Sequence, residues 1–88
     1  MYQSITFHRP KTAAAKLGCG PSKLYKDVRA GIVPRPLKNG PASVWPEHEL
    51  DSINAAVIAG YSNDERRELV KALESARANI DVLPQQAA

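Results

Sequence analysis

The residues best suited to chemistry in this chain are four polar side chains between positions 22 and 29. They are Ser22, Lys23, Lys26 and Arg29. On a helix, residues three and four apart are neighbours, so a helix over this segment would carry the four side chains on its exposed surface. Hydroxyl and cationic groups on such a surface donate hydrogen bonds to phosphate oxygens. The chemistry that they indicate is the binding of a polyanion.

Other reactive side chains form no arrangement typical of an active site. Cys19 is the single cysteine, and no histidine accompanies it in a recognisable pattern. His8 and His48 are too few and too far apart for a metal site. Glu47 and Glu49 would point apart on a helix and suit the positive end of its dipole. We therefore predict no enzymatic activity, no metal and no cofactor.

The size and composition of the chain predict one small domain. Its 88 residues are 43% hydrophobic and 24% charged, which is ordinary for a folded domain with a modest core. One cysteine permits no internal disulfide and fits a reducing cytoplasm. The chain has no apolar run of about 18 residues and no apolar signal core, so we expect a cytoplasmic protein without a membrane partner.

Charge differs sharply between the two halves of the chain. Residues 1–46 hold eight lysines and arginines against the single acidic residue Asp27, whereas residues 47–88 hold four against eight acidic residues. A strongly basic half is the electrostatic signature of a polyanion partner. Phosphates would repel the acidic half, so we expect it to face away from a bound duplex.

Two short helices are needed to position the cationic residues. The first is predicted over residues 11–17, where the Thr12 hydroxyl is able to cap it. The second is predicted over residues 21–30, with Gly20 as its cap and a proline at its first position. A glycine follows each helix and favours its end. Two short helices joined by a turn that contains glycine describe a helix-turn-helix.

A β-hairpin is predicted after the second helix. Two prolines exclude helix there, and Asn39–Gly40 is the strongest short signal for a hairpin turn. We place the hairpin arms at residues 35–38 and 42–45. Arg35 and Lys38 then lie on the first arm, which would make the hairpin a basic wing.

Apolar residues of the second helix and of the hairpin are predicted to form part of the core. Leu24 and Val28 are four residues apart and should face inward, and Tyr25 should lie between core and surface. Trp45 follows a predicted strand and precedes a helix that begins at a proline. We interpret it as a core residue under the hairpin; the alternative is a stacking platform for single-stranded nucleic acid.

Two further helices are predicted in the acidic half. One runs from Pro46 to about Ala59, and the other begins at a capping box formed by Ser62 and Glu65. Their inward stripes are Leu50, Ile53 and Val57 in the first helix, and Leu69, Leu73, Ala76 and Ile80 in the second, widened by Val70. The second stripe either packs on the core or mediates self-association.

The ends of the chain complete the predicted organisation. Tyr2, Ile5 and Phe7 either form a short edge strand or pack loosely over the core. The predicted segments are an arm or strand over residues 1–10, a DNA-binding domain over 11–60, a C-terminal helix over 61–81 and a flexible tail over 82–88.

The order of these segments resembles a known group of proteins. AAAKLG precedes the turn, SKLYKDVRAGIVPRPLKNG covers the second helix and the hairpin, and VWPEHELDSI enters the third helix. Together they resemble the AlpA-like and excisionase-like small winged helix-turn-helix proteins, which are relatives of the MerR DNA-binding domain. The stretch INAAVIAGYSNDERRELVKALESAR also looks like the extension of some AlpA-like regulators. The resemblance covers about residues 11–78 and implies a mainly α fold of about four helices with a β-hairpin wing.

The resemblance implies double-stranded DNA as the partner, contacted from three segments. These are the recognition helix with Ser22, Lys23, Tyr25, Lys26 and Arg29, the wing with Arg35, Lys38 and Asn39, and the first helix with Lys11 and Thr12 at the DNA backbone. Ser22, Lys23 and Lys26 would lie nearest the major groove. Each group has a plainer alternative: a solvated helix face for the cations, half-buried packing for Tyr25, and simple exposure for the wing residues.

The sequence departs from the family pattern at one position of the turn. Family members usually cap the second helix with a hydroxyl residue, whereas this chain has Gly20, which puts one phosphate contact in doubt. Cys19 stands where these proteins place a small buried apolar residue, and a free cysteine behaves as one.

Proteins of this group act in two related ways. Some regulate transcription of phage or integrative-element genes, and others are excisionases, which bend DNA near attachment sites and direct an integrase towards excision. The resemblance therefore implies a bacterial, nucleoid-associated protein whose further partners are an integrase and other copies of itself. The alternative is a protein-interaction module, such as an antirepressor or adaptor, that uses the same fold without DNA.

Overall fold

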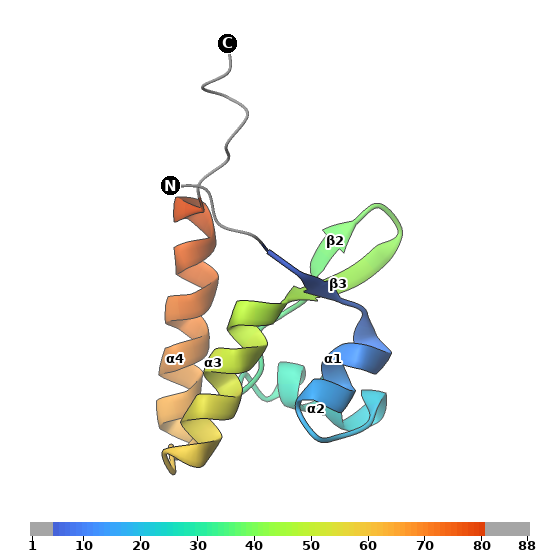
Figure 1. Cartoon of the computed structure of the whole chain (residues 1–88). Coiled ribbons are helices and arrows are strands. Elements are labelled where there is room, and N and C mark those ends of the chain that lie inside the picture. Colours follow the sequence, from blue (N-terminus) through green and yellow to red (C-terminus); the bar gives the residue numbers. More distant parts are fainter. Residues whose placement is uncertain (1–4, 81–88) are drawn as a thin grey trace.

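Helices account for most of residues 5–80, the part of the chain that the computed structural model describes. The elements are β1 (Phe7–His8), α1 (Pro10–Lys16), α2 (Pro21–Arg29), β2 (Leu37–Asn39), β3 (Ala42–Pro46), α3 (Glu47–Ile58), α4 (Asn63–Ala76) and a 3-10 helix, η1 (Arg77–Asn79). Figure 1 shows α3 and α4 side by side, with α1 and α2 below the sheet on the other side. This confirms a mainly helical fold with a small antiparallel sheet. Tyr2 and the tail predicted at 82–88 lie outside the described residues.

The helix boundaries follow the local signals in the sequence, with one exception. Gly20 is the N-cap of α2 and a proline follows it, and Ser62 and Glu65 form the predicted capping box of α4. Thr12 does not cap α1, so that prediction is wrong. The helix begins at Pro10, because proline suits the first helical position. The N-cap is therefore Arg9. The Thr12 hydroxyl instead donates to the Arg9 carbonyl at 3.1 Å.

The sheet has the strand order β1-β3-β2 and is antiparallel throughout. β1 pairs Phe7 with Pro46, which confirms the edge-strand alternative for this part of the N-terminal segment. In the hairpin, Asn39 pairs with Ala42, so the turn residues are Gly40 and Pro41 rather than the predicted Asn39–Gly40. Gly40 has a φ of 63°, which the first central position of a primed hairpin turn requires.

The core lies where α1, α2, α3 and the sheet meet. Trp45, Leu24 and Leu50 are completely buried, as predicted. Val57 is 55% exposed and Ala56 is buried in its place, so the predicted α3 stripe is wrong at that position. Consecutive residues on a helix point about 100° apart, so the burial of Ala56 directs Val57 away from the core.

The predicted stripe of α4 also needs correction. Val70, predicted only to widen the stripe, is the one α4 residue that is buried. Ala76 and Ile80 are exposed, and α4 ends at Ala76, so helical spacing does not extend to Ile80. Between residues 5 and 80, no helix has both the length and the apolar character needed to cross a bilayer.

Candidate nucleic-acid interface

α2 separates a buried face from a polar face. Leu24 is fully buried on the inner face. Ser22, Lys26 and Arg29 follow one another at intervals of four and three residues and are all exposed. Residues with this spacing line up on one side of a helix. The structure therefore brings three of the predicted contact residues together in one row along the outer face of α2.

Lys23 lies beside this row and has an acidic partner. Its Nζ donates to Asp27 Oδ2 at 2.9 Å, one helical turn away. The lysine side chain is 63% exposed and that of Asp27 only 14%. The lysine end of the pair is therefore accessible to a phosphate, but its transfer to DNA would leave the largely buried Asp27 carboxylate without this partner.

Tyr25 packs against Trp45 and belongs partly to the core. The ring centroids are 5.8 Å apart and the ring planes meet edge-on at 68°. Trp45 is completely buried and its Nε1 donates to the Pro34 carbonyl at 2.7 Å. A buried indole cannot stack on a nucleic-acid base, so the structure excludes the single-strand alternative for Trp45.

The β2–β3 hairpin carries two of the predicted contact residues. Lys38 and Asn39 are both exposed on β2, and Lys38 Nζ donates across the hairpin to Ser43 Oγ at 3.2 Å. Arg35 does not lie on a hairpin arm as predicted. β2 begins only at Leu37, because the preceding proline has no N–H for strand pairing.

Arg35 lies next to α4 instead. Its Nε is 3.9 Å from Glu74 Oε1, and its side chain is 73% exposed. The arginine is accessible to solvent, but a carboxylate lies beside it. The structure thus separates Arg35 from the two predicted wing residues on β2.

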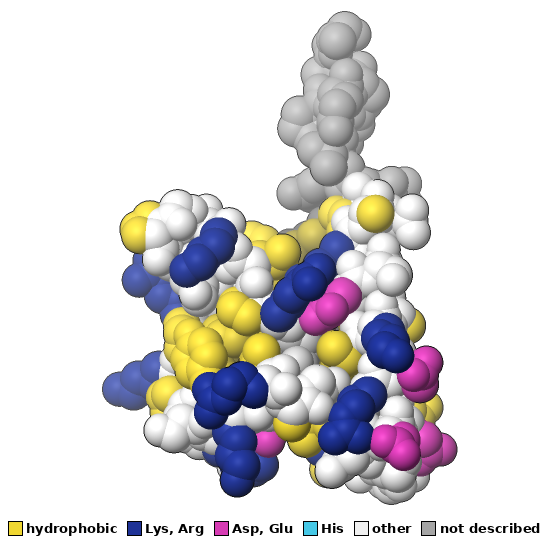
Figure 2. Space-filling view, turned by 180° about the vertical axis from the view of Figure 1, so that it is seen from behind, with side chains coloured by type: hydrophobic (Ala, Val, Ile, Leu, Met, Phe, Trp, Pro, Cys, Tyr) yellow, Lys and Arg dark blue, Asp and Glu magenta, His cyan; other side chains and the backbone are white. Residues whose placement is uncertain are grey.

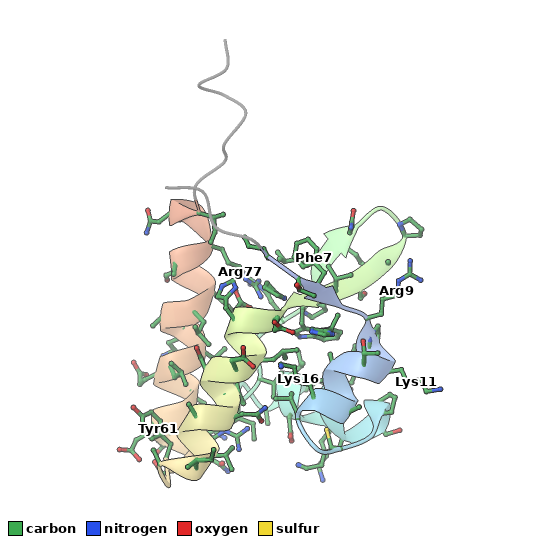
Figure 3. The ribbon with its side chains drawn as sticks, viewed as in Figure 1. Phe7, Arg9, Lys11, Lys16, Tyr61 and Arg77 are labelled. Carbon is green, nitrogen blue, oxygen red and sulfur yellow. The ribbon has the colours of Figure 1, made fainter. Side chains whose placement is uncertain are left out.

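The residue before α1 adds a cationic group that was not among the predicted contact residues. Lys11 and Thr12 are exposed on α1, and Arg9 is exposed immediately before it. In Figure 3 the side chains of Arg9 and Lys11 point outward on the same side of the molecule. The sequence could have predicted this position for Arg9, because Arg9 is two residues from Lys11 and precedes the proline that begins the helix.

Lys16 does not contribute to this surface although it belongs to the basic half. Its Nζ lies 2.9 Å from Asp51 Oδ1 and 3.7 Å from Glu47 Oε1. The hydrogen bond that Lys16 donates to Asp51 and the charges of both carboxylates raise the pKa of Lys16 above its ordinary value. Figure 3 shows the side chain directed towards α3. Its charge is therefore used to join α1 to α3.

The cations without an acidic partner are concentrated on α1, α2 and the hairpin. Within residues 5–80, those that form no ion pair there include Arg9, Lys11, Lys26, Arg29 and Lys38. Figure 2 shows Lys and Arg side chains distributed across the back of the molecule, while most of the acidic side chains in view gather on the side where α4 lies. On α4, Asp64 and Glu68 pair with neighbouring Arg67 and Lys71 at 2.8 and 3.2 Å.

Comparison with protein-family models, with curated proteins and with solved structures finds no match to this chain. The chemistry of the site is therefore argued from its own geometry. Among the described residues, no three His, Cys, Asp or Glu side chains lie together as metal ligands. Cys19 is half-buried and packs against the core. What the geometry offers is a set of solvated donors and positive charges on one helix, its neighbour and a hairpin.

Proposed function

We propose that the protein is a winged helix-turn-helix protein that binds double-stranded DNA in a sequence-specific manner. α2 would lie in the major groove and the β2–β3 hairpin would act as the wing. The observation that carries the proposal is the exposed row of Ser22, Lys26 and Arg29 along α2. Lys11 on α1 and Lys38 on the hairpin, which form no ion pair within residues 5–80, add further positive charge, which attracts the phosphate backbone.

Each α2 residue has a role that follows from its position on the helix. Residues near the N-terminus of a recognition helix reach base edges, so Ser22 and Lys23 would read sequence. The positive end of the helix dipole also favours phosphate there. Lys26 and Arg29 stand in the last turn of α2 and would contact the DNA backbone, which sets the register of the protein on the duplex.

The biological role that we propose comes from the resemblance. The protein would act on a phage or integrative element as an excisionase or as an AlpA-like transcriptional regulator. An excisionase would protect several closely spaced sites near an attachment site and bend the DNA. A regulator would protect a promoter. Footprinting on both regions separates the two roles.

The central experiment compares a lysine of α2, Lys26, with a lysine of α4, Lys71. The binding of each variant to duplex DNA is titrated over a range of salt concentrations. A parent protein that neutralises about four to six phosphates should show a log–log salt slope of about −4 to −5. Lys26→Ala should reduce the magnitude of this slope by about 1 and weaken binding. Lys71→Ala removes the same charge from the exposed face of α4 and should leave the slope unchanged.

Two outcomes would contradict the proposal. Equal effects of Lys26→Ala and Lys71→Ala would show that α2 is not the binding surface. Absence of salt-dependent duplex binding by the parent would favour the alternative, a protein-interaction module. One observation favours that alternative: Val57, Ile58 and Tyr61 are 55%, 87% and 45% exposed near the end of α3, and exposed apolar side chains that form a patch are typical of protein contacts.

A further inference from the structure

The main chain that enters the hairpin is held by side chains from three distant elements. The Pro34 carbonyl accepts from Trp45 Nε1 at 2.7 Å. The Arg35 N–H, in the same peptide unit, donates to Glu74 Oε2 at 2.9 Å. The next carbonyl, that of Arg35, accepts from Arg77 Nη2 at 2.8 Å. Three successive polar groups of the main chain are therefore bound by side chains of β3, α4 and η1.

Arg77 is itself fixed by a buried carboxylate. Its Nε and Nη2 donate to the two oxygens of Glu49 at 2.9 and 2.7 Å. The Glu49 side chain is 1% exposed and that of Arg77 is 16% exposed. A bidentate pair of this kind has little rotational freedom, so it aims Nη2 at the Arg35 carbonyl. Figure 3 shows Arg77 extending from the end of α4 towards the start of α3.

These contacts lie immediately before the hairpin. β2 begins two residues after Arg35 and has only three residues, so the hairpin has a short ladder with which to hold its own direction. Lys38, the exposed cation of β2, is three residues from the clamped main chain. The first hairpin arm is therefore attached in two places, by its pairing with β3 and by the main chain of Arg35.

We propose that Glu74 and Arg77 are positioning residues for DNA binding, which aim the hairpin through the main chain of Arg35. The inference depends on the proposed DNA-binding function, and it assigns to the acidic end of the chain a role that needs no contact with DNA. The inference also predicts the direction in which DNA affinity changes. Loss of a carboxylate near DNA should strengthen binding by charge alone, whereas loss of a positioning contact should weaken it.

A pair of substitutions at Glu74 separates these two effects. Glu74→Gln and Glu74→Ala both remove the negative charge, but only glutamine keeps an oxygen that can accept from the Arg35 N–H. We expect Glu74→Ala to bind duplex about three- to tenfold more weakly than Glu74→Gln, the range for one hydrogen bond. Its salt slope should also be smaller, because the contact from Lys38 is lost. Lys71→Ala is the control for an unrelated charge change on α4.

Hydrogen exchange in the free protein tests the same inference without DNA. The amides of Leu37–Asn39 should exchange faster in Glu74→Ala than in Glu74→Gln, while those of α2 stay unchanged. A double variant, Glu49→Met with Arg77→Met, removes the buried pair together and leaves no charge unpaired. It should accelerate the same hairpin amides and lose footprint protection on the hairpin side only.

The outcomes distinguish this inference from the proposed function. If the parent shows no salt-dependent duplex binding, the proposed function fails, while the exchange experiment still decides whether α4 holds the hairpin. If Glu74→Ala and Glu74→Gln agree in hairpin exchange and in duplex affinity, the positioning role is overturned.

Discussion

α2 and α4 both carry several cations, but the cations of the two helices differ in their partners. Lys26 and Arg29 of α2 are exposed and form no ion pair within residues 5–80. On α4, Arg66 and Arg67 donate to the carbonyls of Ile32 and Ala30 at 3.2 and 2.9 Å, at the end of α2. Cations near the C-terminal end of a helix are favoured by its dipole. The number of charges on a helix therefore does not reveal a binding surface; the partners of those charges do.

Arg77→Met should have the largest effect of the substitutions considered, and the effect is on the free energy of unfolding. It would leave Glu49, with a side chain that is 1% exposed, as a buried charge without its partner. Breaking a buried pair in this way costs about 3–5 kcal/mol. Denaturant unfolding should therefore show a strongly reduced free energy of unfolding. Lys26→Ala is the matched control and should change the unfolding free energy by less than about 0.5 kcal/mol. Similar stabilities for both variants would remove the distinction between structural and available cations.

Ser62→Ala should have a moderate effect that is confined to the α4 side. The Ser62 hydroxyl accepts from the Glu65 N–H at 3.1 Å, and the Glu65 carboxylate accepts from the Ser62 N–H at 2.8 Å. Loss of an N-cap hydroxyl typically costs about 1 kcal/mol. The expected result is a lower unfolding midpoint with unchanged duplex affinity. A large loss of affinity would mean that the start of α4 contributes to binding, and the comparison between α2 and α4 would fail.

Lys16→Met should have the smallest effect on the free energy of unfolding. It extends the comparison to a lysine of the basic half that is paired with α3. The pKa of Lys16 is raised above 10.5, so the folded protein holds this proton more tightly than the unfolded chain. Its stabilisation is complete below pH 10.5 and is lost as the pH rises through the folded-state pKa. Urea unfolding should show a less stable variant at neutral pH and a narrowing difference above pH 10.5.

Lys16→Met also tests which basic residues contribute to the proposed DNA binding. Because its charge is paired with α3, the substitution should change duplex affinity less than Lys26→Ala does. Equal losses of affinity would show that net charge, rather than the α2 surface, determines binding.

Features that depend on neighbouring residues were predictable. The capping box at Ser62 and Glu65 and the cap at Gly20 are confirmed, because the groups involved lie within about four residues of one another. The hairpin was predicted, but its turn lies at Gly40 and Pro41. Asn39 and Gly40 satisfy the local turn preference equally well one residue earlier, and only the pairing with β3 selects the register.

Features that depend on distant partners were not predictable in this way. Glu49 was interpreted as a charge at a helix start, yet it is buried against Arg77, 28 residues along the chain. Arg35 was placed on a hairpin arm, but its main chain is bound by Glu74 and Arg77. No spacing in the sequence marks these pairs, since a charged residue has the same local preferences with or without a buried partner.

The sequence by itself determined the N-terminal caps of α2 and α4, the basic character of the first half and the outward row on α2, because backbone preference and helical spacing act over a few residues. Tertiary structure alone decided which charges are available. Lys16 and Arg77 are bound by carboxylates of α3, whereas Lys26 is not paired within the described residues. That choice depends on which segments pack together, and the packing is set by burial of the whole apolar core rather than by any local pattern.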